Sequence, residues 1–161
     1  MRWLALVVAL SLLFAPAAPK RPRAPLPANQ LQEVVNDLKQ RLANGEVARL
    51  EILCTPSSVT QTPLTPRALE AQPHYRLIID DFRASPYRQE FQRAARSLAV
   101  QPLFANPNVR WGMIFYDLDR NRIVGLFYDP ASRSGAVNET SASVLGGLFD
   151  WAQSHFARAF R

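Results

Sequence analysis

The stretch that most restricts the fold is residues 110–129, RWGMIFYDLDRNRIVGLFYD, in which two aromatic-rich runs flank a polar centre. A loop at Leu118–Asn121 brings the two runs together as a β-hairpin with Asp117 opposite Arg122. The expected cross-strand pairs are Tyr116–Ile123, Phe115–Val124, Met113–Leu126 and Trp111–Tyr128. One face then collects Trp111, Met113, Phe115, Val124, Leu126 and Tyr128. The other collects Gly112, Ile114, Tyr116, Ile123, Gly125 and Phe127. Because both faces are apolar, we expect the hairpin to be covered on both sides.

The polar centre of this stretch also resembles the start of a calcium-binding loop. Asp117, Asp119 and Asn121 match the first, third and fifth ligand positions of such a loop. The sixth position needs glycine and the twelfth a bidentate glutamate, but Arg122 and Tyr128 occupy them. Asp and Asn are favoured in turns because their side chains bond nearby backbone amides. We therefore interpret the segment as a turn and expect no metal and no cofactor.

The remaining periodicities predict alternating helices and strands. A helix capped by Asn29 and ending at Gly45 has apolar residues spaced by three and four. Further expected elements are a strand at 47–54, an irregular loop at 55–66, a helical turn at 65–71, a strand at 74–82, a helix after Ser85-Pro86 and a connector at 101–108. After the hairpin we expect a loop from Pro130 to about Thr140, then a helix from about Ser141 that contains Gly146-Gly147. That glycine pair allows either close packing or a local break.

This order predicts an α+β domain: a small mixed sheet of about four strands with a C-terminal β-hairpin, packed against three helices. Hydrophobic residues make up 48% of the chain, enough to form a core. Residues 29–161 suit a single domain.

The first residues have the layout of a secretory signal. Met1-Arg2 is followed by an apolar run over residues 3–15, which is shorter than the roughly 20 residues of a membrane span. Ala15-Pro16-Ala17 places small residues where a signal peptidase cleaves. We expect a signal peptide at 1–17 and export to the periplasm or the medium; the alternative is an uncleaved anchor. Once the signal is cleaved, no integral membrane segment is expected.

Residues 18–28 form a proline-rich basic linker, which changes the meaning of the net charge of +6. The linker and the signal hold four of the nineteen cations, whereas all thirteen acidic residues lie in the domain. The domain itself is therefore close to neutral. Because nucleic-acid binders carry their basic excess on the folded surface, we expect no nucleic-acid partner.

Few residues offer catalytic chemistry. Cys54 is the only cysteine, which excludes an internal disulfide, and its place in the strand pattern favours a buried hydrophobe over a reactive thiol. Neither His74 nor His155 has metal-ligand spacing around it. No strained-elbow serine motif occurs, and Asn138-Glu139-Thr140 has the form of a glycosylation sequon. The sequence gives no catalytic, cofactor-binding or metal residue.

Three hypotheses of function follow. The first is a non-enzymatic binding or interaction protein, with a protein partner or a second copy contacting a hairpin face that the helices leave uncovered. The residues of that surface would be Trp111, Tyr116, Phe127 and Tyr128. The second is a small hydrolase or thiol-dependent enzyme that uses Cys54 with a histidine. The third is a secreted inhibitor or immunity-type protein that inserts the loop 130–140 into a partner.

Overall fold

The computed structural model describes residues 26–157, which form four α-helices and one seven-stranded sheet. The helices are the 3-10 turn η1 Ala28–Gln30, α1 Leu31–Asn44, α2 Pro66–Ala71, α3 Arg88–Arg96 and α4 Leu148–Phe156. The strands are β1 Arg49–Cys54, β2 Tyr75–Ile79, β3 Ala99–Pro102, β4 Trp111–Tyr116, β5 Arg122–Tyr128, β6 Ser134–Val137 and β7 Thr140–Leu145. The expected α+β class is confirmed.

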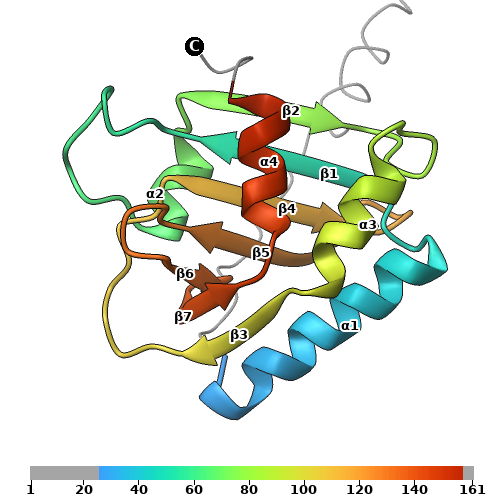
Figure 1. The fold of residues 1–161 in the computed structure, drawn as a ribbon, viewed down its shortest axis with the longest axis horizontal. Helices are drawn as coiled ribbons and strands as arrows, with labels where there is room; N and C mark the ends of the chain where they lie inside the picture. The colour runs from blue at the N-terminus through green and yellow to red at the C-terminus, as the bar shows by residue number, and fades with distance from the viewer. Residues whose placement is uncertain (1–25, 158–161) are drawn as a thin grey trace, which may run out of the picture.

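The sheet has the order β2-β1-β4-β5-β6-β7-β3, and each neighbouring pair is antiparallel. The hairpin β4–β5 lies in its middle. Figure 1 shows α3 and α4 crossing the near face of the sheet with α1 beside them, and α2 behind the sheet. The molecule therefore has a helical layer on one face and a smaller cover on the other.

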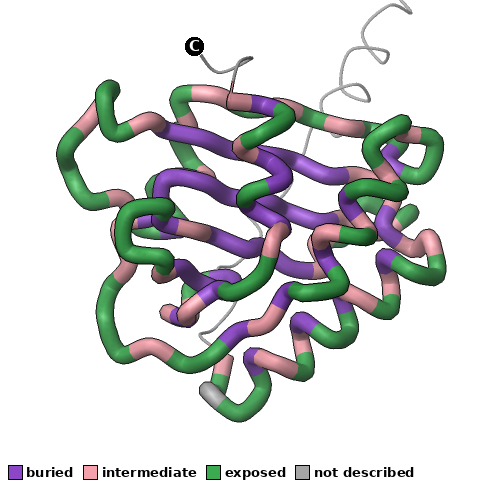
Figure 2. The backbone as a smooth tube through the Cα atoms, in the orientation of Figure 1, coloured by how far each residue is buried: buried purple, intermediate pink, exposed green. Residues whose placement is uncertain are grey.

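Two separate apolar clusters lie on the two faces of the sheet. The larger one includes Met113, Phe115 and Leu126 from the hairpin and the apolar sides of α1, α3 and α4. The smaller one, called the second-face cluster below, contains Leu53, Leu69, Val109, Ile114, Phe127 and Ala136. Figure 2 shows that the central strands consist mostly of buried residues. The alternation of the hairpin residues thus supplies both clusters, as its two apolar faces require.

The hairpin register agrees with the sequence prediction except next to the turn. Phe115 pairs with Val124, Met113 with Leu126 and Trp111 with Tyr128. Tyr116, however, pairs with Arg122 rather than with Ile123, because an irregularity follows Phe115. The Asp117 N–H donates to the Asn121 carbonyl, which closes a three-residue loop whose third residue is left-handed. The shorter loop shifts the register by one residue on one side and explains the wrong pair. The same shift corrects the expected face of Ile123, which packs against the larger cluster instead of the second-face cluster.

The expected cap of the first helix is wrong: Asn29 lies within the 3-10 turn η1, and α1 begins after Gln30 without a side-chain cap. The end of α1 and the start of α2 agree with their sequences. Gly45, at φ +73, ends α1 in the left-handed conformation and its N–H donates to the Leu42 carbonyl. The Thr65 hydroxyl accepts a hydrogen bond from the Ala68 N–H, with Pro66 as the first residue of α2. Ser85 does not cap α3 directly; its hydroxyl accepts from the Tyr87 N–H in the turn before that helix.

The loop expected at 130–140 and the helix expected from Ser141 are wrong, because β6 and β7 form a second hairpin there. Ala142 and Val144 alternate with Ser141 and Ser143, and only the first two are buried. Gly146 follows at φ +105, and a Cβ there would lie 2.4 Å from the Ser97 carbonyl oxygen. The chain therefore breaks at this glycine, and α4 begins only at Leu148.

The expected count of four strands is also wrong. In addition to β6 and β7, residues 99–102 form β3, which pairs with β7 and includes only the first two residues of the expected connector. Val100 on β3 is buried, but Pro102 ends the strand. The strand pattern in the sequence therefore extends over only a few residues, which is too short to predict a strand.

Within residues 26–157, none of the helices combines the length and the apolar character needed to cross a bilayer. The expected signal peptide at 1–17 and most of the expected linker at 18–28 lie outside the described residues.

Candidate functional site

A cleft of about 550 Å³ opens at the end of the sheet where β1 and β5 finish and β4 begins. In Figure 1 this is the left end of these strands. The last turn of α4 contributes Ala157 to its wall. The lining residues are Cys54, Pro56, Ser57, Ser58, Val59, Tyr75, Asn108, Arg110, Trp111, Asp129, Pro130, Ala131 and Ala157. Three strand ends and two loops thus meet around one open space.

Arg110 is the only basic residue among the described residues that line the cleft, and it is 6% exposed. Its backbone joins the sheet, with its N–H donating to the Tyr128 carbonyl and its carbonyl accepting from the Thr55 N–H. Its Nη1 and Nη2 atoms donate to the carbonyl oxygens of Thr60 and Thr62, at 2.9 and 3.3 Å. The side chain therefore holds the loop after β1 against the start of β4.

Asp129, also 6% exposed, is the acidic residue of the cleft. One carboxylate oxygen accepts from the Ala131 N–H at 3.1 Å and the other from the Ser132 hydroxyl at 2.6 Å. Its backbone N–H donates to the Ser134 carbonyl at 2.7 Å. Both oxygens are therefore bonded to the turn between β5 and β6.

Cys54 closes the inner wall of the cleft as the last residue of β1. Its side chain belongs to the larger apolar cluster, and burial raises the pKa of its thiol to about 12. A thiol with this pKa is protonated at neutral pH, whereas the thiolate is the nucleophile. The position favours packing over nucleophilic catalysis.

We expect Cys54 in the native chain to react slowly with an aromatic disulfide reagent. A thiol pKa of about 12 in place of 9.0 lowers the thiolate fraction about a thousandfold at neutral pH, and burial further limits access. The rate should rise with pH and reach that of a free thiol in denaturant. Labelling of the native chain as fast as that of the denatured chain would contradict this result.

Neither histidine is bonded to Cys54 within the described residues. The ring of His155 has Nε2 2.9 Å from a Glu90 carboxylate oxygen and Nδ1 2.9 Å from the Trp151 carbonyl oxygen. His74 lies beside the cleft; its ring packs edge-on against Tyr75, and its backbone N–H donates to the Thr55 hydroxyl. The structure therefore does not assemble the cysteine–histidine pair that a thiol-dependent enzyme needs.

The four residues of the predicted partner surface lie in different environments. Phe127 is fully buried in the second-face cluster and Trp111 is 8% exposed, as part of the larger cluster. Tyr116 and Tyr128 are half-buried, and burial raises the pKa of both phenols. Trp111 also lines the cleft.

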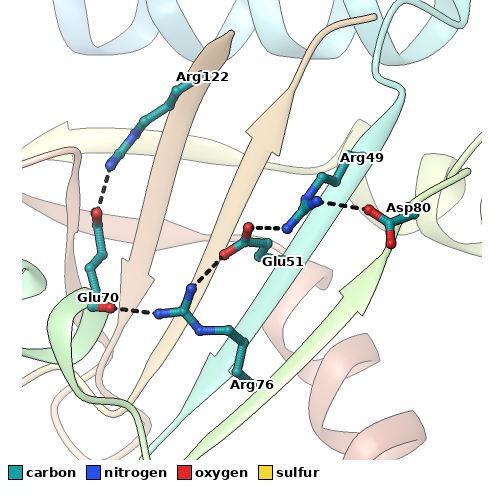
Figure 3. Close-up of polar contacts among 6 residues, drawn as sticks. All are labelled: Arg49, Glu51, Glu70, Arg76, Asp80 and Arg122. Atoms are coloured by element: carbon teal, nitrogen blue, oxygen red, sulfur yellow. Dashed lines mark hydrogen bonds and ion pairs between the residues drawn. The ribbon is translucent and has the colours of Figure 1, made fainter. Parts of the chain in front are cut away.

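A second polar group of residues lies on the face of the sheet that α2 partly covers (Figure 3). Its centre is Glu51 on β1, whose carboxylate oxygens lie 2.8 Å from Arg49 Nη2 and 3.1 Å from Arg76 Nη1. Arg49 Nη1 also lies 2.8 Å from an Asp80 carboxylate oxygen, and Arg76 Nη2 donates to the Glu70 backbone carbonyl at 2.7 Å. The Glu70 carboxylate in turn binds Arg122 at 2.7 Å.

These six residues, three positive and three negative, form a continuous chain of four ion pairs joined by the hydrogen bond from Arg76 to the Glu70 backbone carbonyl. Because the charges alternate and cancel, the group stabilises strands and α2 against each other rather than presenting a charge to a ligand. We call it the ion-pair chain below.

The acidic turn of the first hairpin is confirmed as a turn. The Asp117 carboxylate accepts from the Asn121 N–H at 2.7 Å and lies 3.3 Å from the Asn121 side-chain amide. Residues 26–157 contain no group of three or more His, Cys, Asp or Glu side chains arranged to hold a metal ion.

The sequon asparagine has a structural role. Asn138 is buried at φ +55, and its Oδ1 accepts from the Gly125 N–H at 2.9 Å and from Arg122 at 3.2 Å. A glycan on this side chain does not fit the folded domain, because the amide lies in the interior.

Comparison with protein families, curated proteins and solved structures found no match to this chain. The cleft is therefore interpreted from its own geometry.

Proposed function

We propose that this chain is an exported, non-enzymatic binding domain, and that its contact site is the cleft at the end of β1, β4 and β5. The open space of the cleft is the observation that carries the proposal. At about 550 Å³ it falls within the roughly 300–1,000 Å³ of small-ligand sites. Export is inferred from the signal-like residues 1–17.

The lining of the cleft supports a binding role. Apolar side chains such as Trp111, Tyr75 and Val59 form much of the wall, and a few fixed polar groups interrupt it. Binding sites typically combine an apolar wall with a small number of oriented polar groups that set specificity. Arg110 and Asp129 are held in place by hydrogen bonds to neighbouring loops, so they supply such groups here.

The cysteine supports binding over chemistry. Cys54 faces the same space but carries a protonated thiol, and the described residues place neither histidine ring in hydrogen-bonding contact with it. The alternative of a thiol-dependent enzyme has no activating base in this arrangement. The inhibitor alternative relied on a free loop at 130–140, where β6 and β7 form a hairpin instead.

The test is a screen of small amphipathic compounds against the purified full chain by saturation-transfer NMR. The variant Ser58→Trp places a large ring on an exposed residue of the cleft wall, so it should abolish the signals of most bound compounds. The matched control Ala105→Trp adds the same ring at an exposed residue that does not line the cleft, and should leave them unchanged. Equal binding by both variants and the native chain would contradict the proposal.

A contact with a protein partner or a second copy of the chain stays a prediction for Tyr116 and Tyr128. Both keep part of their side chains exposed, on opposite faces of the hairpin.

A further inference from the structure

We propose that the ligand of the cleft carries a carboxylate next to an apolar or aromatic group, and that Arg110 binds that carboxylate. This inference rests on the binding function proposed above and adds the chemical class of the ligand. It starts from the unusual setting of one guanidinium.

Arg110 is a buried cation without an anionic partner. Within the described residues no carboxylate lies within 4.0 Å of its guanidinium, and its side-chain hydrogen bonds go only to the carbonyls of Thr60 and Thr62. The three arginines of the ion-pair chain each have a carboxylate at 2.7–3.1 Å although they are less buried. A buried charge is costly unless it is paired, so a partner from outside the chain is favoured at Arg110.

The guanidinium still has donors to offer. An arginine carries five N–H groups, and the two side-chain hydrogen bonds of Arg110 use one from each Nη atom. Its Nε makes no hydrogen bond within the described residues, yet it is not among the nitrogen atoms that are sealed from solvent. Because Arg110 lines the cleft and its Nε is open to solvent, we infer that the unused donors are reached from that space. The planar fork of an arginine suits a carboxylate, which accepts two such bonds at once.

Asp129 restricts where the carboxylate can lie. Both of its oxygens already accept hydrogen bonds from the turn that follows, from the Ala131 N–H and the Ser132 hydroxyl. Asp129 follows Tyr128, the cross-strand partner of Trp111, so it lies next to Arg110 at the open end of the hairpin. Because its negative charge repels a second carboxylate, the ligand carboxylate should approach Arg110 from the direction that faces away from Asp129.

The apolar wall defines the rest of the ligand. Cys54 with a protonated thiol, Trp111, Val59 and Ala131 offer apolar surface in the same space. Burying an apolar group there contributes about 25 cal/mol for each Å² removed from water. A small carboxylic acid with an aliphatic chain or a ring satisfies both parts of the cleft.

The experiment compares an acid with its neutral isostere. Phenylpropanoate and phenylpropanamide have the same size and differ in charge, and each is titrated into the purified full chain while the indole N–H signal of Trp111 is followed by NMR. We expect the acid to bind at least about tenfold more tightly, which corresponds to about 1.4 kcal/mol. The preference should shrink as salt is added, because exposed parts of the interaction are screened. A short peptide ending in phenylalanine is titrated in the same way, with a free and with an amidated carboxyl end. Tighter binding of the free-acid peptide than of phenylpropanoate indicates a chain end as the ligand, and weaker binding indicates a small molecule.

Three variants assign the preference to Arg110. In Arg110→Gln the acid should bind about as weakly as the amide. Arg110→Lys keeps a positive charge and should keep part of the preference. Arg67→Gln removes an exposed arginine on α2, outside the cleft, and should change nothing.

The outcomes separate this inference from the function on which it rests. Equal affinity for acid and amide in the native chain, or an unchanged preference in Arg110→Gln, overturns the assignment of a carboxylate to Arg110 but leaves the cleft as a binding site. Failure of every screened compound to respond to Ser58→Trp overturns the binding function itself. Arg110→Gln releases the loop carbonyls, and if it does not fold, the test uses the native chain and Arg110→Lys. The ratio of acid to amide affinity is then compared between these two chains in low and high salt. The inference requires a smaller ratio in Arg110→Lys and a fall with salt, and equal, salt-independent ratios overturn it.

Discussion

Replacing Phe127 by alanine should lower the free energy of unfolding by about 3–5 kcal/mol, the usual cost of removing a buried aromatic ring. Phe127 is fully buried in the second-face cluster, opposite Gly112 and beside Gly125. A Cβ on either glycine would lie 3.0 Å from its ring, so the ring fills the space that the two glycines leave. Its loss leaves a cavity that the rigid sheet cannot close. Urea unfolding followed by circular dichroism measures the change.

The matched control is Phe104→Ala, because Phe104 is fully exposed in the loop after β3. That change should alter the free energy of unfolding by less than about 0.5 kcal/mol. A loss below about 1 kcal/mol for Phe127→Ala, together with weaker binding of a partner, would instead make Phe127 part of a contact surface.

Replacing Glu51 by glutamine should lower the free energy of unfolding by about 2–3 kcal/mol. The Glu51 side chain is 6% exposed and is bonded to both Arg49 and Arg76. Removing one partner of a buried ion pair leaves the remaining charges uncompensated, which costs about 3–5 kcal/mol in full burial. The value is smaller here because the arginine side chains are 22% and 40% exposed and water screens them. Arg49 also keeps its bond to Asp80.

A second readout identifies the cause of that loss. Burial, and then the negative charge of Glu51, raise the pKa of Tyr116. In Glu51→Gln the phenol pKa should fall, but it should remain above its ordinary value because burial persists. Glu139→Gln, an exposed change in the turn between β6 and β7, serves as the control for both measurements. Unfolding and phenol titration curves that overlay those of the native chain would show that the ion-pair chain contributes no stability.

The sequence predicted the central hairpin well because its signal is local. The aromatic runs around Asp117–Asn121 have nearly all their cross-strand partners within a few residues of the turn, and their alternation fixes which face each side chain joins. The same holds for α1, whose apolar spacing ends at Gly45 in the left-handed conformation.

The second hairpin and the site could not be predicted in the same way. The strand β7 consists largely of small residues, so its alternation is weak. Val144, Leu145, Leu148 and Phe149 also fit the spacing of one helix face. Only the positive φ of Gly146 shows that the chain breaks between them. The strand β3 is short and pairs with β7, which lies far along the sequence.

The cleft depends on contacts between distant segments. It joins Cys54 and the loop that follows it, residues 108–111 and residues 129–131, and no short-range pattern links these three segments. Arg110 and Asp129 stand in the sequence as ordinary charges at strand ends, and only the fold shows that both are buried. The only available signal was that an arginine directly precedes and an aspartate directly follows the same apolar hairpin, which brings both to its open end.

Locating a bound ligand tests the central claim most directly. Amide chemical shifts of the full chain are recorded with and without the compound that gives the strongest saturation-transfer signal. We expect the changes to concentrate at residues 54–59, 108–111 and 129–131, which surround the cleft. Changes confined to the ion-pair chain or to α1, with the cleft residues unaffected, would contradict the assignment of binding to this end of the sheet.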